Sequence, residues 1–147
     1  MSLLKVAHVP AATVAPGTTV LDAVRVMARE GVGALAVVEN HGKSELHGIF
    51  TERDVMLRVV QQGRNPRTTP VGDVMTTPVK TASEEMTSAE ALTLMLDRNL
   101  RHLPIVGNDG RLLGMLSIRN LLEDQVEDLQ RSLYSLDQYL SNDGPGG

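Results

Sequence analysis

Two short stretches of the sequence combine a hydroxyl side chain with a carboxylate or an amide three positions later. They are GIFTERDV, residues 48–55, with Thr51 and Asp54, and GMLSIRNL, residues 114–121, with Ser117 and Asn120. A carboxylate offers two acceptor oxygens to neighbouring donors, whereas an amide offers one. A hydroxyl at the start of a helix lies beside free N–H groups and the positive helix end, which favour an anion. Each pair could therefore bind a polar, anionic ligand. The simpler alternative, that each hydroxyl only caps a helix, does not exclude ligand contact.

The two stretches belong to an internal repeat that fills most of the chain. Residues 18–40 align without a gap with residues 86–108, at an offset of 68 positions. Two extra residues in the first copy then lower the offset to 66, which brings residues 48–55 into line with 114–121. Because one copy of roughly 50 residues is too small to close a core alone, the two copies are expected to pack their sheets together.

Each copy predicts the same order of elements, strand–helix–strand–strand–helix. Thr19 and Thr87 are candidate N-caps of helices with an apolar face, and Gly31 and Asn99 are candidates for the left-handed residue that ends these helices. Short apolar runs predict two strands joined by a turn, and a second helix follows. In the first copy the strands are predicted at 34–38 and 46–50 and the helix at 52–60; in the second copy the ranges are 103–106, 112–116 and 118–126.

These residues resemble a tandem pair of CBS (cystathionine-β-synthase-type) domains. VGDVMTTPVKTAS, RHLPIV and the two octets carry the resemblance, which covers roughly residues 3–124. It implies an α/β (α+β) fold in which two β-α-β-β-α repeats pack sheet to sheet as a pseudo-twofold pair. It also implies a non-catalytic regulatory module that binds an adenine nucleotide (AMP, ADP or ATP) between the repeats and acts through an effector protein.

The resemblance predicts one competent pocket and one impaired pocket. In the family, the motif carboxylate binds ribose hydroxyls, while the hydroxyl and neighbouring cations bind phosphate. A ribose diol offers two donors, which suit the two oxygens of a carboxylate. The competent pocket is predicted to contain Thr51, Arg53, Asp54, Arg101, His102 and Arg119. The impaired pocket combines Ser117 and Asn120 with Gly33 and Ala34, and those last two offer phosphate no side-chain donor.

Several of these site residues have a structural alternative. His102 could pack as a neutral histidine under its hairpin, and the three arginines could be solvated surface charges. Thr13 and Thr81 are predicted, from the resemblance alone, to lie in the walls around the adenine ring. His41 and His47 lie six positions apart without a visible third ligand, so no metal site is predicted.

The C-terminal part of the chain predicts a helix with an interaction surface. The apolar residues Leu122, Val126, Leu129, Leu133, Leu136 and Leu140 are spaced 4, 3, 4, 3 and 4 positions apart, which is a heptad pattern. This pattern favours a homodimer, and the alternative is that the helix folds back over the domain. The predicted division is a first repeat at 1–62, a linker at 63–72, a second repeat at 73–124, an amphipathic helix at 125–140 and a disordered tail at 141–147.

Composition narrows the function classes. The chain has 147 residues, a net charge of -4 and no cysteine, which excludes disulfides and cysteine nucleophiles and argues against nucleic acid or an anionic membrane as a partner. Without a signal-like or membrane-spanning run, a cytoplasmic protein is expected. No pattern of catalytic residues supports an enzyme. The alternatives to nucleotide sensing are a constitutive scaffold with vestigial pockets and a sensor of another adenosyl ligand, NAD or S-adenosylmethionine.

Overall fold

The computed structural model describes residues 3–39 and 45–142 and contains two three-stranded sheets. In each sheet the central strand pairs in parallel with a two-residue strand and antiparallel with the strand that follows it. The first sheet contains β1 (Thr13–Val14), β2 (Ala34–Val38) and β3 (Leu46–Thr51), and the second contains β4 (Ala82–Ser83), β5 (His102–Val106) and β6 (Leu112–Ser117). The predicted duplication and the strand order within each copy are confirmed.

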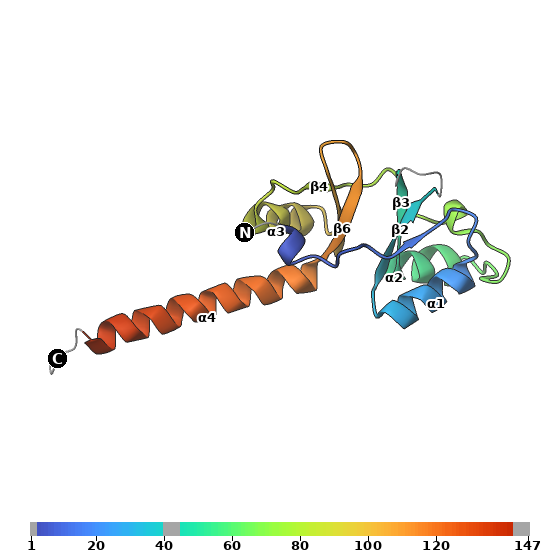
Figure 1. Cartoon of the computed structure of the whole chain (residues 1–147). Helices are drawn as coiled ribbons and strands as arrows, with labels where there is room; N and C mark the ends of the chain where they lie inside the picture. Colours follow the sequence, from blue (N-terminus) through green and yellow to red (C-terminus); the bar gives the residue numbers. More distant parts are fainter. Residues whose placement is uncertain (1–2, 40–44, 143–147) are drawn as a thin grey trace.

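The helices also follow the predicted order. The first repeat has α1 (Val20–Glu30) and α2 (Glu52–Asp54), the second has α3 (Ser88–Asp97) and α4 (Ile118–Asn142), and short 3-10 turns lie at η1 (Leu3–Lys5) and η3 (Val71–Asp73). Figure 1 shows the two sheets side by side in the middle of the molecule, with α3 on one outer side and α1 and α2 on the other. The mixed α/β class with a C-terminal helix is therefore confirmed.

The predicted helix ends are confirmed. Thr19 and Thr87 accept hydrogen bonds from the backbone N–H groups three residues later, at 3.2 and 3.1 Å. Gly31 and Asn99 have φ angles of 66° and 54°, the left-handed conformation that ends a helix. A fully reciprocal capping box occurs at Thr51, whose hydroxyl accepts from the Asp54 N–H while the Asp54 carboxylate accepts from the Thr51 N–H.

The helix predicted at 52–60 differs in type from the expectation. Only α2 is α-helical, and Val55–Val60 (η2) continues it as a wider π-helix, in which the Gln61 N–H donates to the Met56 carbonyl. The wider turn keeps Val59 1% exposed and leaves Val60 69% exposed. A single turn of this kind inside a helix commonly marks a functional site.

The two repeats exchange their N-terminal segments. Leu3, at the start of the chain, is fully buried in the aliphatic core of the second repeat, together with Leu103 and Leu116. Conversely, Val71 and Val74, which precede the second sheet, lie in the core of the first repeat. Each repeat therefore completes its core with chain from the segment that precedes the other repeat.

Backbone hydrogen bonds also join each of these segments to the sheet of the other repeat. His8 forms a two-way hydrogen-bonded bridge with Met115 of β6, and Thr76 forms the corresponding bridge with Ile49 of β3. Between the sheets, Ala36, Ile49 and Met115 form a third buried cluster. This cluster joins the two sheets at their facing surfaces, while each repeat also has a separate core of its own.

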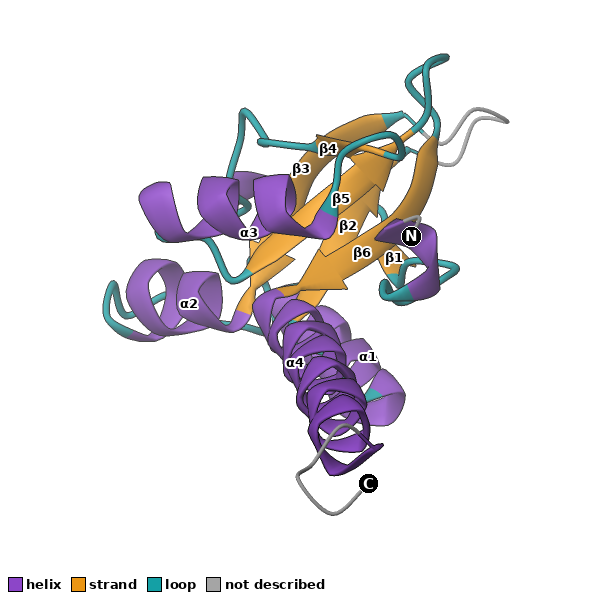
Figure 2. Ribbon diagram, turned by 90° about the vertical axis from the view of Figure 1, so that its left-hand side faces the viewer, coloured by secondary structure: helices purple, strands orange, loops and turns teal. Residues whose placement is uncertain are grey.

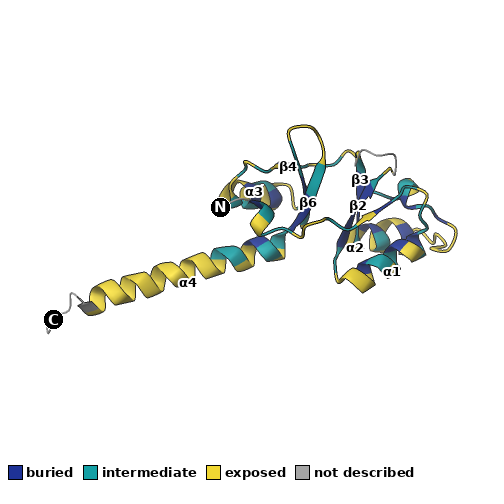
Figure 3. Ribbon diagram, in the orientation of Figure 1, coloured by how far each residue is buried: buried dark blue, intermediate teal, exposed yellow. Residues whose placement is uncertain are grey.

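Helix α4 is longer than either predicted helix, because the segments 118–126 and 125–140 form one continuous helix. Leu121 is fully buried in the second core, whereas the residues after it are increasingly exposed (Figure 3). Figure 2 looks along this helix, which follows directly on β6. It ends at Asn142, two residues into the predicted disordered tail, since Ser141 and Asn142 tolerate a helix better than the Gly and Pro that follow. Residues 143–147 lie outside the described residues.

Candidate ligand-binding site

A cavity of about 410 Å³ lies where the two repeats meet, and it contains five of the predicted site residues. Thr51 is the last residue of β3, and the N-terminal turn of α2 carries the next two. The opposite wall comes from the residues between α3 and the start of β5. The five residues are Thr51, Arg53 and Asp54 from the first repeat and Arg101 and His102 from the second. The structure thus brings together side chains about 50 positions apart, as the resemblance to CBS domains implies.

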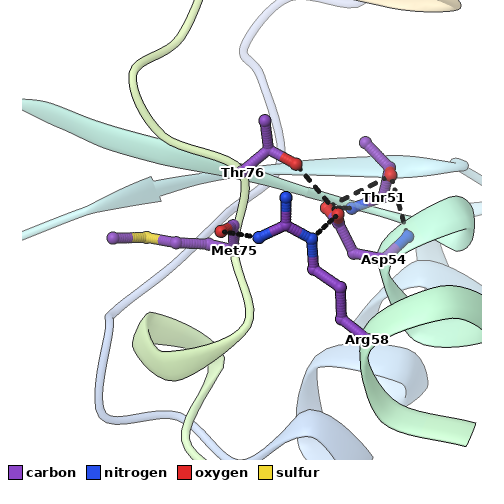
Figure 4. A network of polar contacts seen from close by, with 5 residues as sticks. All are labelled: Thr51, Asp54, Arg58, Met75 and Thr76. Carbon is purple, nitrogen blue, oxygen red and sulfur yellow. Dashed lines mark hydrogen bonds and ion pairs between the residues drawn. The ribbon is translucent and has the colours of Figure 1, made fainter. Parts of the chain in front are cut away.

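The Asp54 carboxylate is the most enclosed polar group in this cavity, at 4% exposure, and both its oxygens have partners. One oxygen accepts from the N–H and the hydroxyl of Thr51, at 3.0 and 3.2 Å. The other accepts from the hydroxyl of Thr76 at 2.8 Å and lies 3.4 Å from Nε of Arg58 (Figure 4). Backbone and side-chain partners therefore occupy the carboxylate where the expected ligand would bind.

The partners of the Asp54 carboxylate differ in how firmly the fold holds them. Thr51 holds Asp54 through the capping box, which is part of the fold of α2. Arg58 is 51% exposed, and its guanidinium also donates to the Met75 carbonyl at 3.2 Å. An exposed arginine contributes little to such a pair because water competes for it. A ligand with two hydroxyl donors could therefore replace Arg58 and Thr76 at one oxygen without unfolding the cap.

The positive charge of the cavity comes from Arg53 and Arg101. Arg53 reaches across the cleft, and its guanidinium donates to the Asn99 carbonyl at 3.5 Å. Burial lowers the pKa of His102 below its ordinary value, the carboxylate of Glu52 opposes this shift and the charge of Arg101 adds to it. At neutral pH the His102 side chain is therefore a neutral hydrogen-bonding group, and the arginines supply the cationic charge.

A second cavity, of about 890 Å³, contains the other motif. It combines Ser117 and Asn120 with Gly33 and Ala34, as predicted. The Asn120 side-chain oxygen accepts a hydrogen bond from the Ser117 hydroxyl, and the Ser117 oxygen accepts from the Asn120 N–H at 3.0 Å. The cap is thus preserved without a carboxylate.

This second cavity is more acidic than the first, which is lined by two carboxylates, Glu52 and Asp54, and two arginines. Three carboxylates line the second cavity, those of Glu30, Glu52 and Glu123, together with one arginine, Arg119. Acidic side chains repel phosphate, and that this cavity binds a nucleotide less well than the first remains a prediction.

Arg119 does not lie where it was predicted. It lines the second cavity and not the first, and it pairs with Glu123 at 3.1 Å. The reason is local: Arg119 follows Ser117 by two positions on its own helix, as Arg53 follows Thr51. Each motif therefore carries its arginine into its own cavity.

The two residues predicted around adenine are also apart from the first cavity. Thr81 lines a different hollow, beside Thr77, Val79 and Arg111. Thr13 is exposed on β1 and lines neither of the two cavities between the repeats. Thr13 belongs to the short edge strand β1, and Thr81 directly precedes the short edge strand β4. Both strands place their threonine away from Asp54.

Sequence reasoning missed three residues of the site. Arg58 could have been found from its i,i+4 spacing to Asp54, which places both on one helical face. Thr76 carries no local signal, because it reaches Asp54 only through the exchange of the segments that precede the repeats. Glu52 gives no such signal because Ile118 stands at its aligned position. It nevertheless lines both cavities with Gly33 and His102, and a Cβ on Gly33 would lie 2.7 Å from its Oε1.

Within the described residues, the structure shows neither a cluster of metal-binding side chains nor a helix that could span a membrane. Within residues 3–39 and 45–142, no three His, Asp or Glu side chains gather into a metal-binding cluster. His41, one of the two histidines considered above, lies outside the described residues. None of the helices in the described ranges is both long enough and apolar enough to cross a membrane.

Comparison with protein families gives two matches along the chain. The family described as "CBS domain" matches residues 5–61 and again residues 71–127. Among curated proteins, the chain is 38% identical over 124 residues to the mitochondrial CBS domain-containing protein CBSX3 of Arabidopsis thaliana, covering 83% of this chain and 60% of that protein. It is 36% identical over 117 residues to the CBS domain-containing protein YhcV of Bacillus subtilis, covering 80% of each. The chain spans about three fifths of the length of the first two curated relatives that it matches.

Solved structures agree with this family. A protein with CBS domains from Burkholderia ambifaria superposes with a TM-score of 0.79 at 31% identity, over 87% of this chain and 96% of the other. CBSX2, solved in complex with AMP, superposes with a TM-score of 0.70 at 22% identity, over 86% and 96% of the two chains. At 22% identity, the likeness to CBSX2 shows only that the two chains share a fold.

Proposed function

Because the chain belongs to the CBS domain family and carries two copies of the domain, we propose that it is a regulatory module that senses an adenine nucleotide. The proposed site is the cavity that contains Asp54. The observation that carries the proposal is the convergence of one enclosed carboxylate, two arginines and a neutral histidine from both repeats on that cavity. A carboxylate for a sugar diol and cations for phosphate are the two groups that a nucleotide needs.

Binding would proceed by exchange of partners at Asp54. In the free protein, Arg58 and Thr76 occupy one of its oxygens. Ribose hydroxyls would donate to the carboxylate in their place, while phosphate would lie toward Arg53 and Arg101. The complex of CBSX2 with AMP supports this ligand class, since that protein shares the fold of the chain.

Sensing requires that the nucleotide prefer one arrangement of the repeats over another. The proposed site takes residues from both repeats, so a bound nucleotide would favour the arrangement in which these residues converge. The module would then pass this preference to an effector protein, and it would act as a homodimer, without catalysis, in the cytoplasm. The effector, the dimer and the location are part of the proposal.

The second candidate is a constitutive scaffold, and one observation favours it. The Asp54 carboxylate already has four partners within the chain, so the site is complete without a ligand. On this hypothesis the cavity would be vestigial and the nucleotide would not bind.

Isothermal titration calorimetry separates the two candidates. The purified chain is titrated with adenosine, AMP, ADP and ATP, and in parallel with NAD and S-adenosylmethionine. The expected result is one nucleotide per chain, with affinity rising from adenosine to the phosphorylated forms. Absence of binding by all six compounds would contradict sensing of these ligands and favour the scaffold. Tighter binding of S-adenosylmethionine than of AMP would contradict the role of the arginines.

A further inference from the structure

Helix α4 presents a single apolar stripe to solvent beyond the body of the molecule. The stripe residues are 47 to 64% exposed, although all are leucine or valine: Leu122, Val126, Leu129, Leu133, Leu136 and Leu140. Figure 1 shows the helix projecting away from both sheets. With 25 residues it is about 37 Å long at ~1.5 Å per residue. A stripe of this kind is stable in water only when another surface covers it.

The fold-back alternative is not what the structure shows. Ile118 and Leu121, in the first turn of α4, contact the core of the second repeat, and of the residues from 122 to 141 only Asp124 and Gln125 are half-buried. From Leu122 onward the stripe leads away from the body (Figure 3). The partner for the stripe must therefore come from another chain.

The spacing within the stripe identifies the kind of partner. The 4-3 alternation places leucine at all three d positions, 122, 129 and 136, and Val126, Leu133 and Leu140 at the a positions. Such a seam accepts a helix with the same 3.5-residue repeat, because knobs from one helix fill holes in the other. We propose that the α4 helices of two copies pair along this stripe as a parallel, in-register coiled coil.

The charges that flank the stripe choose the orientation. In an antiparallel pair with full overlap, e positions face e positions, which would set Glu123 against Asp137 of the partner subunit twice. In a parallel pair, g positions face e positions of the next heptad. The opposed residues are then Gln125 with Gln130 and Ser132 with Asp137, and no like charges meet. The charge pattern therefore favours the parallel arrangement.

The same helix connects this interface to the second cavity. Arg119 and Glu123 line that cavity, and Leu122, the first residue of the stripe, lies between them. The inference itself does not depend on nucleotide binding, since the stripe and its flanking charges are independent of Asp54.

Sedimentation velocity of the full chain tests the pairing. Leu129→Glu combined with Leu133→Glu should convert a dimer to a monomer, because both charges would be buried in the seam. The matched control, Ser135→Glu with Gln138→Glu, adds the same charges on the outer face of α4 and should remain dimeric. Circular dichroism checks that the body of each variant is folded. A wild-type monomer, or a dimer that persists in the seam variant, would overturn the proposal.

A second variant separates α4 from another exposed apolar surface, on η2. Met56 and Val60 of η2 are 58% and 69% exposed, so they could also form a dimer interface. Met56→Glu with Val60→Glu should leave the dimer intact. Loss of the dimer in this variant alone would assign the interface to η2 and contradict the inference.

Disulfide crosslinking tests the orientation, and the chain contains no cysteine that could interfere. Leu136→Cys should form a covalent dimer on mild oxidation, because equivalent d positions face each other in a parallel pair. Gln138→Cys, on the outer face, should not. A dimer in which Leu136→Cys fails to crosslink would contradict the parallel register, because an antiparallel pair sets Leu136 against Val126 of the partner subunit.

Discussion

The two cavities between the repeats are built on the same backbone but differ in their chemistry. Both contain a hydroxyl that caps a helix and an arginine two positions later. At the aligned positions, however, Asp54 is replaced by Asn120 and Thr76 by His8, while Asp124 stands where the first repeat has Arg58. The fold therefore needs only the capping hydroxyl and the backbone around it, and the neighbouring side chains decide which ligand each cavity can accept.

The charged residues around the two cavities add to the difference between them. Arg53 and Arg101 line only the first cavity and Glu30 and Glu123 only the second, whereas Glu52 lines both. Under the proposed function, one of the two cavities binds the nucleotide and the other does not. The predictions below test this inequality.

The largest expected effect is at the motif carboxylate. Asp54→Asn should weaken AMP binding by at least about 100-fold, since two hydrogen bonds to a charged acceptor are lost or reduced, at roughly 1.5–3 kcal/mol each. Asn120→Ala, the matched change in the second cavity, should leave the affinity nearly unchanged. Calorimetry gives both affinities, and thermal unfolding shows whether either variant is destabilised. Equal losses in the two variants would mean that the cavities are equivalent.

The next effect concerns phosphate. Arg101→Gln should weaken ATP binding by about tenfold, AMP binding by less, and adenosine binding hardly at all, since a charge-assisted contact to phosphate contributes about 1.5 kcal/mol. Arg119→Gln is the control, because Arg119 lines the other cavity. Fluorescence titrations at two salt concentrations measure both. If Arg119→Gln has the larger effect, the first cavity is not the phosphate site.

Much of this comparison could be predicted from the sequence, and the reasons are local. Capping residues such as Thr19 and Thr87 act within three positions, and the repeat constrains where strands recur, so the order of elements followed from the sequence pattern. The grouping of Thr51 with Arg101 followed from the resemblance to the family. The cavity of Arg119 differs from the prediction, although its alignment with Arg53, two positions after each capping hydroxyl, agrees with each arginine lining its own cavity.

The occupation of Asp54 also lay beyond sequence reasoning. Thr76 reaches it only because the two repeats exchange their preceding segments, a pairing that no local pattern encodes. The π-helical turn that follows is a comparable case, since hydrophobic spacing at 52–60 fits an ordinary helix equally well.

The pH dependence should be smaller and should depend on His102. Burial lowers its pKa in the free protein, and a phosphate beside it would raise that pKa again, so binding takes up a proton. AMP affinity should therefore increase as pH falls from 8 to 6. This increase should be about threefold larger in the wild-type protein than in His102→Gln. The variant serves as the control for the titration of the phosphate itself. An identical pH profile in both proteins would place phosphate away from His102.

The same shift predicts the pH dependence of stability. Because the folded pKa lies below the ordinary value of 6.5, the unfolded chain takes up a proton first as pH falls through that value. The free energy of unfolding should then decrease below about pH 6.5, down to the folded pKa, and His102→Gln should remove this part of the decrease. Urea denaturation at a series of pH values measures it.

The smallest expected effect is an increase in AMP affinity. Arg58 occupies the carboxylate oxygen that ribose would use, so Arg58→Met should tighten AMP binding by about threefold, in keeping with the 0–1 kcal/mol of an exposed ion pair. Arg25→Met removes a comparable exposed pair with Asp22, far from the site, and should have no effect. Calorimetry at one pH and salt concentration compares the two. Weaker binding in Arg58→Met would show that Arg58 belongs to the bound state as a phosphate ligand. The four partners of Asp54 would then be a preformed site, with nothing for the nucleotide to displace except Thr76.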